Sequence, residues 1–285
     1  MSENVLFDVP GPKGRRRARI INVISWVVIL GVLVYVLIAL QQKGQLTADK
    51  WSPLVSAPTW TAYLLPGLLS TVKAAGAAIL CSIAFGLLFG VGRLARFAPL
   101  RIASGIVVEF FRSVPVLILM IFFWYFLSFG KIVDAGSSPF FAVVVGLTLY
   151  NGSVIAEVVR ASVENLPKGQ REAGLAIGMT PRQALRLIEL PQALVVMMPA
   201  LVAQLVVIMK DTALGYIVTY PELLRQARLV GTANGNLIPT LIVVAALFVA
   251  VNYSLGRLAE IIAKRLERRT AGSPEKVEAA AGQIV

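Results

Sequence analysis

Arg171–Gln192 reads REAGLAIGMTPRQALRLIELPQ, and its glycine, threonine and proline residues describe two short helices joined by a sharp turn. Gly178 can take the left-handed conformation that ends many helices. Thr180, Pro181 and Gln183 then supply an N-cap, a first-turn proline and the second member of a capping box. The stretch therefore predicts a helix-turn-helix whose second helix runs into the following apolar segment.

The first of these helices is expected to begin at Asn165, a good N-cap, with Pro167 in its first turn. Side chains at positions i, i+3, i+4 and i+7 of a helix share one face, and small residues let another surface approach closely. An exposed apolar stripe on such a helix is typical of a partner site, although a helix lying on lipid fits the pattern equally well. The shared face comprises Glu172, Leu175, Ala176 and Met179, the small neighbours are Ala173 and Gly174, and Gly178 makes the turn.

The rest of the chain is too apolar for an ordinary soluble domain. Hydrophobic residues make up 57% of the 285 residues, charged residues 15%, and the mean hydropathy is +0.78. A soluble domain carries about 25% charged residues. Histidine is absent, which removes the commonest general base and the commonest metal ligand. The composition favours a membrane protein and argues against most hydrolases and against a metal site.

Uncharged runs of the length that a membrane span needs, about 20 residues, predict an all-α polytopic protein with six transmembrane helices. The competing run Trp51–Val72 contains three prolines and two tryptophans, so residues 41–65 are expected to form an extracytoplasmic or interfacial segment. Cys81 is expected to be a buried small hydrophobe. The six predicted spans are Ile20–Leu40, Ala74–Gly92, Ser113–Gly130, Pro139–Ala156, Leu190–Met209 and Leu229–Gly256.

The first predicted span is interpreted as an uncleaved membrane anchor. Its apolar part, about 21 residues, exceeds the roughly 7–15 residues of a signal-peptide core. Residues 1–19 and 265–285 have the composition of tails, and residues 66–264 are expected to form the core, with a loop at 165–191. In the predicted span Ala74–Gly92, Gly86 and Gly90 lie four residues apart and would let helices approach closely, although glycine is frequent in membrane helices in any case.

The positions of the basic residues predict the orientation. The net charge of +12 does not indicate nucleic acid, because Lys and Arg flank the apolar runs as membrane topology requires. The richer side is expected to be cytoplasmic, which places both termini there. Its clusters are Lys13–Arg19, Arg93–Arg112, Arg160–Arg186 and Lys264–Lys276, whereas the other side holds only Lys43, Lys50, Lys131, Arg225 and Arg228.

Ionisable groups in or beside a membrane are costly and are therefore functional candidates. Lys210 and Asp211 follow a long uncharged run, and with Thr212 they are candidates for a substrate path. A lysine could hold a carboxylate and an aspartate an ammonium group, which would suit a zwitterion. The alternative is that both side chains extend into water at the outer headgroup level.

Two further candidates for the path lie in the fourth predicted span and just after it. Asn151 would either bond to a neighbouring helix or line the path. Glu157 precedes Arg160 by three residues, so a local ion pair competes with a role in gating. Glu109 and Arg112 have the same spacing, and the same local pairing is expected there.

The opening stretch resembles the "EAA" loop of the membrane subunits of bacterial ABC importers. The motif positions are occupied by Glu172, Ala173, Gly174, Gly178, Ile188, Leu190 and Pro191. Only Gly174 departs from the motif, because alanine is usual at that position. In that family the loop forms the coupling helix, which enters a groove of the ATP-hydrolysing subunit. The resemblance therefore favours a partner site over a helix lying on lipid.

Longer stretches resemble the permeases for polar amino acids. They are EFFRSVPVLILMIFFWYF from Glu109, NGSVIAEVVRASVENLPKGQREA from Asn151 and MKDTALGYIVTYPELL from Met209. The likeness covers roughly residues 67–264, and the additional N-terminal anchor resembles the longer glutamate permeases of the group. In these permeases a pair like Lys210–Asp211 lines the substrate cavity.

The resemblance implies a non-catalytic permease subunit of the bacterial inner membrane, surrounded by lipid. Its implied partners are a separate ATPase subunit that binds ATP and Mg²⁺, a second permease subunit, either a copy or a relative, and an extracytoplasmic amino-acid-binding protein. Glutamate or aspartate is the favoured substrate. The chain has no G-x-x-x-x-G-K-[ST] phosphate-binding loop, so no cofactor is expected on it. A stand-alone secondary transporter or channel is the alternative, which internal repeats would support.

Overall fold

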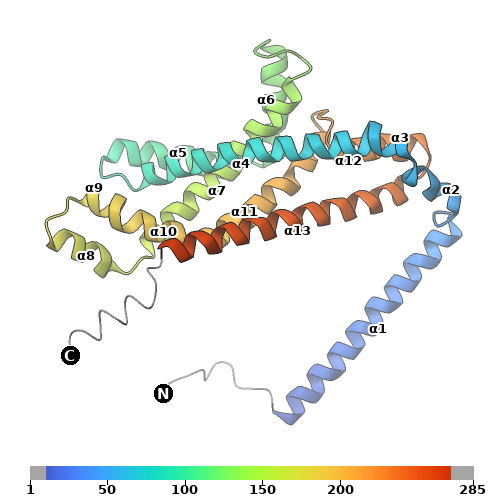
Figure 1. Ribbon diagram of the computed structural model, residues 1–285, viewed down its shortest axis with the longest axis horizontal. Coiled ribbons are helices and arrows are strands. Elements are labelled where there is room, and N and C mark those ends of the chain that lie inside the picture. The colour runs from blue at the N-terminus through green and yellow to red at the C-terminus, as the bar shows by residue number, and fades with distance from the viewer. Residues whose placement is uncertain (1–10, 271–285) are drawn as a thin grey trace.

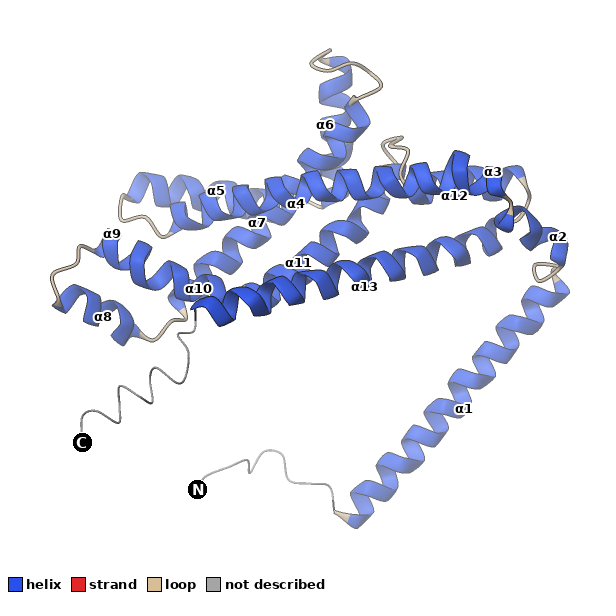
Figure 2. Ribbon diagram, in the orientation of Figure 1, coloured by secondary structure: helices blue, strands red, loops and turns tan. Residues whose placement is uncertain are grey.

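The computed structural model describes residues 11–270, and within this range all regular structure is helical (Figure 2). Five helices there are long and apolar enough to cross a membrane, or six if one bent pair counts as a span. The predicted all-α polytopic fold is confirmed. The longer elements are α1 (Pro12–Gln42), α4 (Leu65–Arg93), α5 (Ala98–Ser113), α6 (Val116–Phe129), α7 (Ser138–Glu164), α11 (Met198–Asp211), α12 (Leu223–Ala233) and α13 (Leu237–Thr270).

Short elements connect these helices. Before α4 lie α2 (Ala48–Trp51), the 3-10 turn η2 (Ser52–Val55), α3 (Ala57–Thr59) and the π turn η3 (Trp60–Leu64). After α7 lie α8 (Lys168–Ala176), α9 (Pro181–Ala184), the π turn η4 (Leu185–Glu189) and α10 (Leu190–Val196), and the 3-10 turn η5 (Thr212–Tyr216) follows α11. In Figure 1 α4 and α13 run along the molecule with α7 and α11 between them, whereas α1 extends away from this bundle.

A row of small residues positions α4 against α7, the most extensive helix contact in the described chain. Ala74, Ala78, Ser82, Gly86 and Gly90 recur every fourth residue and are all buried, so they form one stripe on α4. A Cβ added at Gly86 would lie 2.4 Å from Ile155 Cγ2, and one at Gly90 would lie 2.8 Å from Val159 Cβ. The predicted close approach at these two glycines is confirmed, and we call the contact the α4–α7 seam.

The predicted span Ser113–Gly130 corresponds to α6, which is shorter than predicted and forms a bent pair with α5. α6 has 14 residues, which corresponds to about 21 Å of helix, less than the roughly 30 Å of the hydrocarbon core. Pro115 forces the preceding Val114 into an extended conformation and so separates α5 from α6. The two helices meet at 100°.

The predicted last span exists, but its predicted bounds, Leu229–Gly256, merge two helices. α12 ends at Ala233, Gly235 has a left-handed φ of 57°, and α13 begins at Leu237. The turn is bonded to the segment before α4: Lys50 Nζ donates to the Gly235 carbonyl over 2.8 Å, and Asn236 Nδ2 donates to the Lys50 carbonyl over 2.8 Å. This turn is polar but uncharged, so a search for uncharged runs cannot detect it.

The second span begins earlier than predicted. Helix continues from Ala57 to Arg93 over 37 residues, in place of a start near Ala74. Pro66 is tolerated inside this helix because the π turn η3 precedes it and alters the hydrogen bonding that a proline would interrupt. Cys81 is exposed on the apolar surface of α4, so its predicted burial is wrong.

Both predicted tails are shorter than expected. Helix α1 begins at Pro12, so its basic residues extend the anchor helix, and α13 continues to Thr270. The remaining parts of the two predicted tails, residues 1–10 and 271–285, lie outside the described residues.

The α4–α7 seam predicts a sharp difference between two glycines of α4. Gly86→Ala should destabilise the protein by about 1–3 kcal/mol, because the new Cβ overlaps Ile155. Gly76→Ala should leave stability equal or slightly higher, because nothing lies within 4 Å of its Cβ. Thermal unfolding of the purified protein measures both. Equal stability of the two variants would contradict the seam, whereas partial rescue of Gly86→Ala by Ile155→Ala would support it.

Candidate functional site: the α8–α9 hairpin and the ion pairs beside it

Helices α8 and α9 form the predicted helix-turn-helix. Gly178 makes the turn with a φ of 86°. The capping box is present: Thr180 Oγ1 accepts a bond from the Gln183 N–H over 3.4 Å, and Gln183 Oε1 accepts one from the Thr180 N–H over 2.8 Å. Pro181 occupies the first turn of α9, as predicted.

The predicted start of the first helix is wrong. Asn165 caps the carboxyl end of α7 instead, because α7 continues to Glu164. Pro167 occupies the N-cap of α8, so α8 begins at Lys168 and has nine residues.

Gly174 brings α8 against the second half of the hairpin. It is buried, and a Cβ there would lie 2.7 Å from Ile188 Cδ1 and 3.6 Å from Ala184 Cβ. The glycine that departs from the usual EAA pattern therefore lies at a close contact between α8 and η4. Gln192 Nε2 also donates to Gln170 Oε1 over 3.1 Å, which fixes the base of the hairpin to α10.

The residues of the predicted face of the first helix do not share one surface in the structure. Met179 follows the turn and lies outside α8, so it does not continue the stripe that begins at Glu172. Glu172 and Leu175 line a cleft between the hairpin and the ends of α4 and α5. On α8 and the turn that follows it, the exposed apolar residues outside this cleft are Ala173, Ala176 and Ile177, the last with 75% of its surface exposed. Ile177 lies off the predicted helical stripe and was therefore absent from the predicted face.

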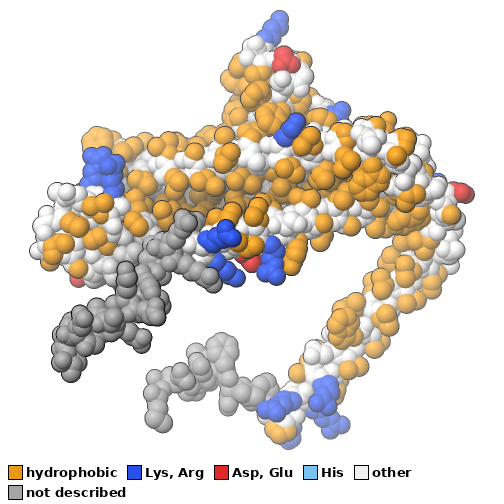
Figure 3. Space-filling view, in the orientation of Figure 1, with side chains coloured by type: hydrophobic (Ala, Val, Ile, Leu, Met, Phe, Trp, Pro, Cys, Tyr) orange, Lys and Arg blue, Asp and Glu red, His pale blue; other side chains and the backbone are white. Residues whose placement is uncertain are grey.

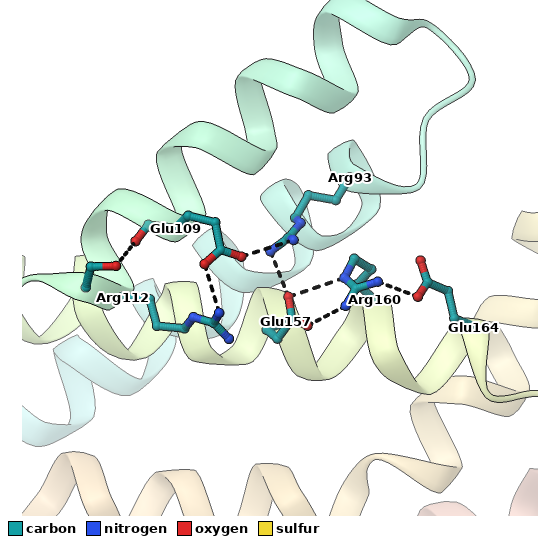
Figure 4. A network of polar contacts seen from close by, with 7 residues as sticks. Arg93, Glu109, Arg112, Glu157, Arg160 and Glu164 are labelled. Atoms are coloured by element: carbon teal, nitrogen blue, oxygen red, sulfur yellow. Dashed lines mark hydrogen bonds and ion pairs between the residues drawn. The ribbon is translucent and has the colours of Figure 1, made fainter.

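Ion pairs tie α4, α5 and α7 together beside the hairpin (Figure 4). Arg93, the last residue of α4, lies 2.7 Å from the Glu157 carboxylate on α7 and 3.2 Å from Glu109 on α5. Arg112 pairs with Glu109 over 2.8 Å, and Arg160 pairs with both Glu157 and Glu164. The predicted local pairs Glu109–Arg112 and Glu157–Arg160 are confirmed.

Arg93 connects these two local pairs into one cluster. Its side chain is only 14% exposed, so its charge depends on both carboxylates for compensation. In the sequence Arg93 was recognisable only as one of the basic residues that predict topology, because no spacing rule relates residues 64 positions apart. The pairing could have been suspected because Arg93 follows the end of one predicted span and Glu157 follows the end of another.

Asn151 is a residue of α7 that contacts α11. It is fully buried, its Nδ2 donates to the Leu147 carbonyl over 3.0 Å, and its Oδ1 accepts a bond from Gln204 Nε2 over 2.5 Å. The structure thus shows the first of the two predicted alternatives, a bond to a neighbouring helix. Gln204 was overlooked because it is an uncharged residue within an apolar run.

The residues at the end of α11 differ in burial. Lys210 is exposed, Asp211 is half-buried, and Thr212 is buried with its hydroxyl donating to the Met209 carbonyl over 2.6 Å. The helix narrows here to the 3-10 turn η5. Among the described residues no hydrogen bond or ion pair links Lys210 or Asp211 to Asn151 or Glu157.

Glu222 is a buried acidic residue directly before α12. It caps α12, and its carboxylate accepts bonds from the Leu224 and Arg225 N–H groups, each over 2.6 Å. Burial raises its pKa to about 7. The neighbouring Tyr220 hydroxyl donates to the Ser70 carbonyl and the Leu223 N–H donates to Thr71 Oγ1, so this capped turn is fastened to α4.

The fold is that of an integral membrane protein, and the hairpin is a short helical projection between two of its spans. Residues 82–268 match the family described as binding-protein-dependent transport system inner membrane component. The chain belongs to this family, and it is therefore an inner-membrane component of a transport system.

Relatives and solved structures agree with this assignment. The chain is 44% identical over 227 residues to the glutamate transport system permease protein GluD of Corynebacterium glutamicum, covering 80% of this chain and 83% of the relative. It is 31% identical to the glutamate/aspartate import permease protein GltK of Escherichia coli, covering 78% and 98%.

Two solved structures share the fold. An inward-facing structure of the MetNI methionine ABC transporter has a TM-score of 0.63 at 25% identity, covering 74% of this chain and 99% of that one. The structure of an amino acid ABC transporter with histidines has a TM-score of 0.65 at 24% identity, covering 72% and 95%.

The ion-pair cluster predicts that Arg93 contributes more to stability than an exposed arginine does. Arg93→Gln should cost about 1.5–3 kcal/mol, because two carboxylates lose a charged donor in a partly buried site. Arg257→Gln is the control: its pair with Glu260 is 3.4 Å long and exposed, so the cost should be at most about 1 kcal/mol. Unfolding of both variants in the same detergent measures the difference, and equal losses would contradict the linking role of Arg93.

Proposed function

We propose that this chain is the membrane subunit of an ATP-driven importer, and that the α8–α9 hairpin transmits motion from a separate ATPase subunit. The observation that carries this proposal is that the hairpin is rigid and presents an exposed apolar edge. A glycine turn, a capping box and the Gly174–Ile188 contact make it rigid, and Ala173, Ala176 and Ile177 leave an exposed apolar edge. Such an edge on an otherwise polar helix suits docking of another protein.

The mechanical path from the hairpin leads through α7. The hairpin follows α7 directly along the chain, and Arg93, Glu157 and Glu109 hold the adjacent ends of α4, α5 and α7 together. Along the seam the glycines leave no space for α4 to slide past Ile155 and Val159. Closure of two ATPase subunits would therefore move these helices as one body and shift the transport path between inward-open and outward-open states.

The complex requires further subunits. A second permease subunit, a copy or a relative, would complete the path, and an extracytoplasmic binding protein would deliver the substrate. ATP and Mg²⁺ would be bound by the ATPase subunit, so this chain has no catalytic role of its own. Under this proposal the hairpin faces the ATPase in the cytoplasm. The distribution of basic residues favours the same side for both termini.

The proposed substrate is an acidic amino acid, glutamate or aspartate. GluD and GltK, whose names specify glutamate and glutamate/aspartate, support this assignment. Lys210 supplies an exposed positive charge at the end of α11, where a substrate carboxylate could bind, and the half-buried Asp211 could receive the ammonium group.

The hairpin turn is tested by Gly178→Val. A β-branched residue is strained at a φ of 86°, so the turn should deform and ATP-dependent uptake should fall at least tenfold in vesicles containing the whole importer. The control is Gly169→Val in α8, whose φ is ordinary and whose Cβ has nothing within 4 Å. Uptake at the wild-type level by Gly178→Val, with the protein inserted, would contradict the proposed transmission.

The proposed substrate contact is tested by Lys210→Ala. Loss of the charge should raise the KM for glutamate at least tenfold or abolish uptake, while the assembled importer remains intact. Lys73→Ala is the control, because Lys73 is also an exposed lysine, on α4, and no substrate role is proposed for it. If the two variants transport glutamate equally well, Lys210 is no more than an interfacial lysine.

A further inference from the structure

A cleft lies between the hairpin and the ends of α4 and α5. Its volume is about 1340 Å³, larger than the roughly 300–1,000 Å³ of typical small-molecule pockets. α4 and α5 form one wall, and α8, α9 and η4 form the other. Figure 3 shows basic side chains gathered at this end of the molecule, where α5 lies beside α9. We call this space the basic cleft.

The charge of the basic cleft is largely uncompensated. Among its lining residues, Arg93 and Glu164 belong to the ion-pair cluster described above, and Glu172 and Glu189 are the other acidic members. The remaining basic residues form no ion pair within residues 11–270; they are Arg96, Arg101, Lys168, Arg171, Arg182 and Arg186. A multiply charged region with so few carboxylates favours an anionic occupant.

The inner wall of the same cleft is apolar and exposed. Leu88 on α4 has 70% of its surface exposed, and Phe97 and Leu100 at the start of α5 have 68% and 50%. Leu88 precedes Arg93 by five residues, so it lies about 7.5 Å deeper along α4 toward the membrane interior. A soluble partner that docks on Ala173, Ala176 and Ile177 would contact residues that do not line this cleft. An acyl chain, in contrast, would reach the apolar wall of the cleft from the bilayer.

We propose that the basic cleft binds an anionic phospholipid from the leaflet on the hairpin side of the membrane. The phosphate would lie among Arg96, Arg101 and Arg186, and an acyl chain would cover Leu88 and Leu100. This arrangement places the headgroup between the span ends and the hairpin, so the lipid would support the hairpin at the angle seen in the structure. Basic pockets between helices at a membrane face are suited to such headgroups.

The test uses the whole importer in nanodiscs of phosphatidylcholine that contain a minor fraction of phosphatidylglycerol. The variant Arg96→Gln/Arg101→Gln/Arg186→Gln removes three charges from the basic cleft. The control Arg16→Gln/Arg17→Gln/Arg19→Gln removes three charges from α1, at the same face by the predicted topology but outside the cleft. Native mass spectrometry counts the phosphatidylglycerol molecules that remain bound to each complex.

We expect the cleft variant to retain about tenfold less phosphatidylglycerol than the wild type and the α1 variant to retain as much as the wild type. A charge-conserving variant, Arg96→Lys/Arg101→Lys/Arg186→Lys, should retain most of the lipid, which distinguishes lost binding from lost folding. Equal retention by the wild type and the cleft variant would overturn the proposal, as would equal losses in the cleft and α1 variants. Loss of the ATPase subunit with the lipid retained would instead assign the cleft to a protein interface.

Discussion

The close contact of α4 with α7 is the constraint on which the rest of the structure depends. Without a hydrophobic driving force between helices inside a bilayer, packing relies on close backbone approach. A residue without a bulky side chain at every fourth position of α4 permits that approach, and Ile155 and Val159 occupy the space that larger side chains would take. At the hairpin end the same contact brings Arg93 within reach of Glu157, so the packing also creates the ion-pair cluster.

Because the α4–α7 contact is rigid, the hairpin can transmit force to the membrane helices. A short helix of nine residues has little stability alone, and α8 is held by its contact at Gly174, its turn at Gly178 and the bond between Gln170 and Gln192. Force applied to its exposed edge would pass into α7 and across the seam, because neither joint contains a long flexible loop. The Glu222 cap and the Lys50–Gly235 bond fasten the far end of the bundle in the same way.

Sequence reasoning predicted what depends on local chemistry. The turn at Gly178, the capping box at Thr180 and the pairs three residues apart follow from backbone preference and helix spacing. What it could not predict depends on residues distant in the chain, such as Arg93 with Glu157 or Asn151 with Gln204. Helix boundaries failed where uncharged residues interrupt a helix, at Pro115 and at Gly235, because charge alone was used to divide the spans.

The central claim is that α4 and α7 move as one body during transport. Spin labels at Leu80→Cys on α4 and Phe141→Cys on α7, in a Cys81→Ser background, place both probes on exposed positions. The distance between them is measured by double electron–electron resonance in the assembled importer, with and without ATP. The account predicts one unchanged distance distribution in both states. A shift of the distribution by several ångströms on ATP binding would contradict it.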